Sequence, residues 1–209
     1  MAKRIMLASP DTPLHNIAAE PTTSSMASTT VDLTRAAQLL GNGLPYSQPG
    51  FLPADLLSAA RQSAEHLQSE QHVLPEPLRR VVRVVDELRA LLASATGRPL
   101  LERAELQCLK YKSGGSYRRH LDDSVNLSIG AAGNSVRRSI SLLIYLTPDD
   151  WQPSDGGALR CHIASDTAVD ILPMAGTLVL FDSASVPHEV CRTERARTVI
   201  AGWLQEARA

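Results

Sequence analysis

The first and last hundred residues follow different patterns of apolar and polar positions. In the first part, apolar residues recur every three or four positions, which predicts amphipathic helices. One helix begins near Val31 and ends at the glycine turn 41–43. A second begins at Pro53, which suits a first turn because its missing N–H would be unpaired there. A third helix follows Pro77 and ends at Gly97.

After position 104, short apolar runs separated by turn residues predict seven strands. They cover residues 105–111, 138–146, 157–163, 168–172, 176–181, 188–192 and 197–204. Helices followed by a run of strands are typical of an α+β domain whose helices pack on one face of a β-core. The sequence therefore predicts one domain with helical support over about 31–97 and a β-core over about 104–204, within residues 31–209.

Residues 1–30 have a different texture, rich in Ser, Thr, Ala and Pro and without a sustained period. Such a segment buries too little apolar surface to offset the entropy lost on ordering. We interpret residues 1–30 as a disordered N-terminal tail.

Composition narrows the class of protein. The 209 residues are 44% hydrophobic and 21% charged, as in an ordinary soluble domain. The net charge of −1 provides no basic excess for phosphates, so no nucleic-acid partner is expected. No apolar run approaches 18 residues, so no membrane span is expected. Three widely spaced cysteines without a CxxC pair indicate a reducing compartment, and we predict the cytoplasm.

Two histidines have neighbours that suggest a metal. His120 and Asp122 are two positions apart, so on an extended segment their side chains point to the same side. His188 lies 66 positions after Asp122, at the start of a predicted strand. Two imidazoles and one carboxylate on one face of a metal suit non-haem Fe(II), since they leave positions open. A His-x-Asp pair alone is common by chance, and Asp122 alone is also a good turn residue.

Arg197 opens the last predicted strand, nine residues after His188. An arginine that faces into a barrel is costly unless an anion meets it, and a co-substrate carboxylate would be such an anion. The alternative is that Arg197 points outward into solvent.

The motifs LKYKSGGSYRRHLDDS, RRSISLLIYLTPDDW, GGALRCHI and GTLVLFDSASVPHEVCRTERARTVIAGWL occur in this order over about residues 104–204. Together they resemble the Fe(II)/2-oxoglutarate-dependent prolyl 4-hydroxylase-like dioxygenases, closest to the oxygen-sensing protein prolyl hydroxylases and their bacterial and algal relatives. The resemblance implies a double-stranded β-helix, the jelly-roll or cupin-like core, with N-terminal helices on one face.

The resemblance also implies roles for individual residues. His120, Asp122 and His188 match the iron ligands, and Arg197 matches the arginine that pairs with the distal carboxylate of 2-oxoglutarate. Other matches are Tyr145, to a tyrosine on that carboxylate; Tyr111, to one beside the iron; and Arg138 and Trp203, to positions where the substrate residue is held.

This sequence departs from the oxygen-sensing enzymes at two places. Ala201 stands where they have a threonine close to the co-substrate, and the glycine turn before His120 is one residue shorter. The four apolar strand residues Leu142, Ile144, Leu178 and Leu180 are predicted to form the dry lining of the site.

The expected function is oxidative hydroxylation of a prolyl residue in a protein or peptide. It would use Fe(II), O₂ and 2-oxoglutarate, with ascorbate as a further candidate, and release succinate and CO₂. Alternatives are an oxygenase for a small molecule, such as a free amino acid or peptide natural product, and a retired barrel that only binds a ligand. The pairs Arg118-Arg119 and Arg137-Arg138 hint at an acidic partner or form a solvated rim. The sequence predicts no oligomeric state.

Overall fold

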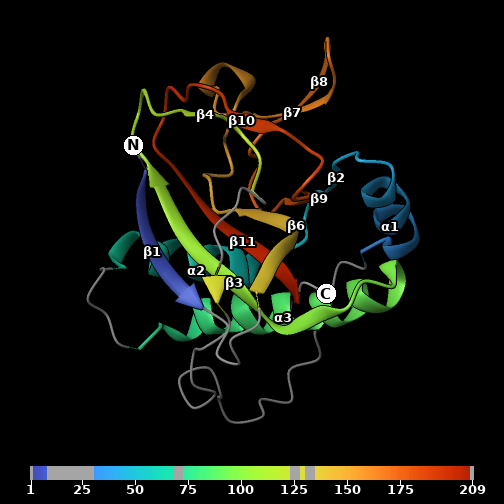
Figure 1. Ribbon diagram of the computed structural model, residues 1–209. Helices are drawn as coiled ribbons and strands as arrows, with labels where there is room; N and C mark the ends of the chain where they lie inside the picture. Colours follow the sequence, from blue (N-terminus) through green and yellow to red (C-terminus); the bar gives the residue numbers. More distant parts are fainter. Residues whose placement is uncertain (1, 9–30, 68–72, 123–127, 130–134, 208–209) are drawn as a thin grey trace.

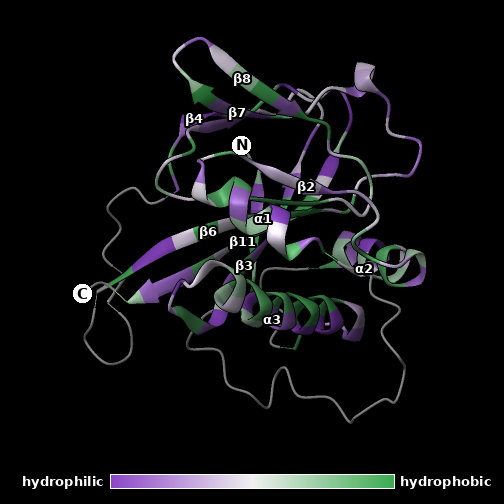
Figure 2. Cartoon of the chain, turned by 90° about the vertical axis from the view of Figure 1, so that its right-hand side faces the viewer, coloured by the Kyte–Doolittle hydropathy of each residue, from purple (hydrophilic) through white to green (hydrophobic). Residues whose placement is uncertain are grey.

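The computed structural model describes residues 2–8, 31–67, 73–122, 128–129 and 135–207. In these residues, helices, a large antiparallel sheet and a smaller antiparallel sheet form three layers, with the longest helix, over residues 76–96, beneath the large sheet (Figures 1 and 2). The large sheet has the order β1-β3-β11-β6-β9-β2, with β5 beside β6, and the small sheet has the order β4-β10-β7-β8. The helix layer on one face and the strand core confirm the predicted α+β architecture.

The three predicted helices are confirmed. They are α1 (Leu33–Gly41), α2 (Ala54–His66) and α3 (Glu76–Thr96). The carboxylate of Asp32 caps α1 by accepting a hydrogen bond from the amide of Arg35, at 2.9 Å. Gly97 ends α3 in the left-handed conformation, with φ of 68°, which glycine adopts without strain. No helix in the described part of the chain is both long and apolar enough to cross a membrane.

The seven predicted strands are also confirmed, with shifted ends. They are β3 (Leu100–Tyr111), β6 (Ser135–Tyr145), β7 (Leu159–Ala164), β8 (Thr167–Ile171), β9 (Leu178–Asp182), β10 (His188–Val190) and β11 (Arg197–Ala207). The periodicity missed β1 (Lys3–Ala8), β2 (Tyr46–Gln48), β4 (Tyr117–His120) and β5 (Ser128–Ile129). Strands β2, β4 and β5 have two to four residues and no apolar run that marks them, and β1 lies in a segment whose composition is polar.

The assignment of all residues 1–30 to a tail is wrong for residues 3–8. They form β1, which pairs antiparallel with β3 at the edge of the large sheet. Ile5 and Leu7 are 5% and 4% exposed because they pack into the helix-side core. Hydrogen bonds from β3 and this burial stabilise a short segment that composition alone marks as polar. Residues 9–30, also assigned to the tail, lie outside the described residues.

Alternation along the strands separates the two faces of the large sheet. On β6, Leu142 and Ile144 belong to the core shared with the helices, whereas Leu143 and Tyr145 belong to a second cluster on the inner face. The inner face is opposite the helices and lies toward the small sheet (Figure 2). The predicted lining of Leu142, Ile144, Leu178 and Leu180 is therefore wrong in phase. All four side chains pack in the helix-side core, and of the four only Leu142 also borders the cavity described below.

Candidate active site

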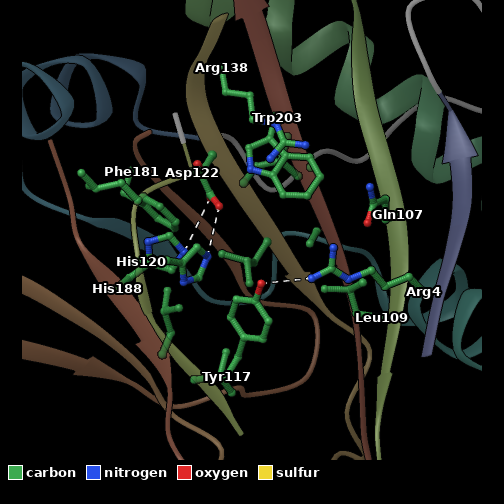
Figure 3. Close-up of a pocket in the computed structure, with 18 of the residues that line it drawn as sticks. Arg4, Gln107, Leu109, Tyr117, His120, Asp122, Arg138, Phe181, His188 and Trp203 are labelled. Carbon is green, nitrogen blue, oxygen red and sulfur yellow. Dashed lines mark hydrogen bonds and ion pairs between the residues drawn. The ribbon is translucent and has the colours of Figure 1, made fainter. Parts of the chain in front are cut away.

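Strand register brings the three candidate metal ligands together. His188, the first residue of β10, lies opposite His120, the last residue of β4. Asp122 follows two residues after His120 and turns its carboxylate toward both imidazoles (Figure 3). The grouping predicted from sequence thus converges on one point at the inner face.

The geometry of this cluster suits a metal ion. The three ligand atoms lie within 4.8 Å of one another. The Asp122 carboxylate lies 3.3 Å from Nε2 of His120 and 3.6 Å from Nε2 of His188. Each Nδ1 faces a backbone carbonyl, that of Arg118 at 2.9 Å and that of Val186 at 3.1 Å. A Nδ1–H that donates to a carbonyl leaves the lone pair on Nε2, where a metal would bind.

The environment of Asp122 keeps its carboxylate charged. Burial raises its pKa, but His120, His188 and a hydrogen bond from Ser141 outweigh burial and lower the pKa to about 2. The Ser141 hydroxyl donates to Oδ2 at 2.7 Å, and its oxygen lies 2.8 Å from the hydroxyl of buried Ser183. Ser141 and Ser183 escaped the sequence analysis because serines carry no motif signal in a strand.

The pKa values of the two imidazoles shift in opposite directions. Burial lowers the pKa of His188 more than Asp122 raises it. Burial also opposes charge on His120, but the hydrogen bonds to Asp122 and to the Arg118 carbonyl outweigh it and raise the pKa of His120. Phe181, which the sequence analysis did not single out, packs its ring 4.5 Å from that of His188, between centroids. A neutral, packed His188 is already in the form that binds a metal.

Arg197 is buried inside the barrel, with 2% of its surface exposed. Its Nη1 donates to the carbonyl of Gly157, while Nε and Nη2 find no hydrogen-bond partner within the described ranges. Among the described residues no carboxylate lies within ion-pair distance of it. A buried guanidinium with two unbonded nitrogens lacks an anion, because desolvation of such a charge is costly without one.

Tyr111 and Tyr145 flank this guanidinium. Its central carbon lies 5.0 Å from the ring centroid of Tyr111 and 5.3 Å from that of Tyr145. The buried Tyr145 hydroxyl has no hydrogen-bond partner among the residues that the structure describes, and burial raises the pKa of Tyr145 to about 12. Two unbonded nitrogens and a neutral phenol in one place are donors suited to a carboxylate.

A cavity of about 230 Å³ opens beside the metal cluster (Figure 3). Tyr111, Ala201 and Trp203 line it, whereas Arg197 and Tyr145 are not among its lining residues. Tyr111 thus both lines the cavity and lies next to the Arg197 guanidinium. Arg138 also lines the cavity, with its guanidinium 3.6 Å above the ring centroid of Trp203. The predicted substrate pair is thus in contact with the cavity.

Two arginine pairs were noted in the sequence as a hint of an acidic partner or as a solvated rim. In one of them, Arg137-Arg138, both side chains are paired with acidic residues of the chain itself. Arg137 forms an ion pair with Glu206, and Arg138 forms a bidentate pair with Glu105 at 2.8 and 3.0 Å. Arg118 and Arg119 are exposed on β4 and form no ion pair in the described part of the chain.

Comparison with known proteins agrees with this site. Residues 106–205 match the family model of the 2OG-Fe(II) oxygenase superfamily. A PKHD-type hydroxylase from Hyphomonas neptunium is 27% identical over 133 residues, which cover 60% of this chain but only 57% of that protein.

Solved structures are similar over most of the chain. A Pseudomonas putida prolyl-4-hydroxylase has a TM-score of 0.71 and 29% identity, covering 89% of this chain and 99% of that one. A prolyl hydroxylase from Trichoplax adhaerens, in complex with a hypoxia inducible factor oxygen degradation domain peptide fragment, has a TM-score of 0.63. It is 20% identical and covers 82% of this chain and 90% of that one, a likeness that shows the fold alone. The jelly-roll core implied by the sequence motifs is therefore confirmed.

Proposed function

Because residues 106–205 match the family model of the 2OG-Fe(II) oxygenase superfamily, we propose that this chain hydroxylates a prolyl residue of a protein or peptide. The observation that carries the proposal is the pairing of two incomplete sites, one based on β4 and β10 of the small sheet and the other on β11 of the large sheet. One is a His-Asp-His cluster with its ligand atoms turned inward. The other is a buried arginine with unbonded donors.

His120, Asp122 and His188 would hold Fe(II). The carbonyls behind both imidazoles and the Ser141 hydroxyl behind Asp122 would keep the three ligands oriented. With 2-oxoglutarate and O₂ bound, the iron would supply the oxidising chemistry, which consumes the co-substrate to succinate and CO₂.

Arg197 would bind the distal carboxylate of 2-oxoglutarate through Nε and Nη2, and the Tyr145 hydroxyl would donate a further hydrogen bond. Neither group lines the cavity, so the co-substrate would extend from the cavity past the ring of Tyr111, which lies next to the Arg197 guanidinium. Apolar neighbours of the inner face would exclude water and strengthen these interactions. Ala201 adds no hydroxyl to these contacts.

Arg138 and Trp203 would hold the substrate residue at the mouth. Stacking fixes the guanidinium over the indole and leaves the flat surface of Trp203 beside the metal cluster.

The three cysteines are free thiols, as suits the cytoplasmic location that we propose. Ascorbate would keep the metal reduced.

The test incubates the purified protein with Fe(II), 2-oxoglutarate, O₂ and proline-containing peptides, and then with free L-proline. We expect succinate and peptides heavier by one oxygen on proline, with less product when ascorbate is omitted. Oxygen on free L-proline and on none of the peptides would replace the proposal by the small-molecule alternative. No succinate from any arm, at saturating Fe(II), would favour the retired barrel.

A further inference from the structure

The cavity contains a second arginine, Arg4, whose charge is balanced by no acid in the described part of the chain. It comes from β1, lines the cavity, and donates from Nη2 to the Tyr117 hydroxyl at 3.3 Å (Figure 3). Its guanidinium carbon lies 5.7 Å from the Tyr117 ring centroid. Among the described residues, no carboxylate lies within ion-pair distance of Arg4.

Arg138, the other arginine of this cavity, differs in this respect. Both oxygens of Glu105 accept hydrogen bonds from it, and Trp203 covers its flat face. The carboxylate of the lining, Asp122, is held by the two imidazoles. Arg4 is therefore the cation of the lining that is left for a ligand.

Strand register fixes the direction of the Arg4 side chain. Arg4 lies opposite Leu109 of β3, another lining residue, whereas Ile5 and Leu7 point to the helix-side core. Alternation thus turns Arg4 toward the inner face, and the burial of Ile5 and Leu7 holds the strand in that phase.

We infer that Arg4 binds a carboxylate of the substrate, the acidic side chain of a peptide near the residue to be oxidised. The inference rests on the proposed function and adds the substrate class. Tyr117 contacts Arg4 on one side and His120 on the other, with its ring centroid 4.7 Å from that of His120. Since an extended peptide advances about 3.3 Å per residue, the acid lies within about two or three residues of the target.

The test measures peptide binding to protein loaded with Zn(II), which has no redox chemistry, and 2-oxoglutarate. Two peptide libraries share a central proline. One carries a single Glu and the other a single Gln, and this residue is placed in turn at each of the three positions before and after the proline. We expect the wild type to bind the Glu peptide about fivefold more tightly at one or two positions at low salt, the gain typical of an exposed ion pair.

Charge variants of β1 locate the effect. Arg4→Gln removes the preference for Glu, and Arg4→Lys retains it. Lys3→Gln makes the same change of charge on the neighbouring exposed residue, which does not line the cavity, and also retains it. Equal binding of both libraries to the wild type, binding of neither library, or an unchanged preference in Arg4→Gln would each overturn the inference.

The same libraries, incubated with the Fe(II) protein and O₂, separate this inference from the proposed function. Preference for Glu that depends on Arg4, without oxygen on any peptide, would leave the role of Arg4 intact and remove the hydroxylase proposal. Equal addition of oxygen to proline in both libraries, with no effect of Arg4→Gln, would support the hydroxylase proposal and remove the role of Arg4.

Discussion

The two faces of the large sheet use the same strands for different purposes. On the helix side, Leu142, Ile144 and Ile200 are at most 1% exposed and pack among other apolar side chains. On the inner side, the same strands bury Arg197 and Tyr145, and two guanidinium nitrogens and the phenol hydroxyl have no hydrogen-bond partner among the described residues. The first arrangement stabilises the fold, and the second costs stability that ligands would return. This difference predicts that substitutions on the two faces have opposite signatures.

The largest effect is expected at the metal cluster. His188→Ala should weaken binding of Fe(II) by more than about 100-fold, since even residues that only orient metal ligands are typically worth 10- to 100-fold. An anaerobic metal titration would measure it. Wild-type affinity in this variant would remove His188 from the ligands.

The matching change on the helix side is Ile144→Ala. A cavity in this apolar core should lower the free energy of unfolding by about 2–5 kcal/mol, read from denaturant curves. Fe(II) affinity of the folded protein should equal that of the wild type. A selective loss of metal affinity without destabilisation would contradict the division between the faces.

Arg197→Met tests whether the buried charge on the inner face lowers the stability of the ligand-free protein. Loss of charged hydrogen bonds should weaken 2-oxoglutarate binding by about 10- to 100-fold. Thermal unfolding without ligand should stay the same or shift upward, because an unpaired buried charge is replaced by an apolar chain. Calorimetry of both processes measures this, and a large drop in unfolding temperature would mean that Arg197 holds the fold instead.

Ser141→Ala tests the hydrogen bond that orients Asp122 in the metal cluster. Asp122 would lose the hydroxyl that orients it, so metal affinity should fall by about tenfold. Ser141→Thr, which keeps a hydroxyl, is the matched control. Equal affinities in Ser141→Ala and the wild type would show that the two imidazoles suffice to orient Asp122.

The smallest effect concerns Asp182, at the polar edge of the helix side. Burial raises its pKa, but Ser185 and Arg98, 2.8 Å away, outweigh burial and lower it. The stabilisation should be present above the unfolded pKa, near 3.9, and disappear as pH falls through the lower folded value. Asp182→Asn should therefore cost about 1 kcal/mol at pH 7 and less below pH 4, by urea unfolding at each pH. A difference independent of pH would contradict this origin.

Two kinds of feature could be predicted from the sequence: elements long enough to show a repeating apolar pattern, and sites where several residues with distinctive chemistry occur together. Helices of nine to 21 residues and strands of five or more in the β-core show their period or their boundaries. The metal cluster was found because His120, Asp122 and His188 carry chemistry that few structural roles require. Its orienting groups, Ser141 and the backbone carbonyls, have no such signal.

Two failures have physical causes. The run LLIYL is apolar at every position because both faces of this strand are buried, so a period of two leaves no trace and the phase was chosen wrongly. Arg4 was missed because β1 exists only through its pairing with β3, a contact over about a hundred positions. Long-range pairing of a short edge strand is invisible to local patterns.

Anaerobic visible absorption during titration with Fe(II) and then 2-oxoglutarate tests the account most directly. The account predicts a charge-transfer band in the wild type and in Ile144→Ala, none in His120→Ala, and a band in Arg197→Met that needs at least about tenfold more 2-oxoglutarate. No band in the wild type at saturating Fe(II) and 2-oxoglutarate would contradict the claim that the inner face joins a metal site to a co-substrate site.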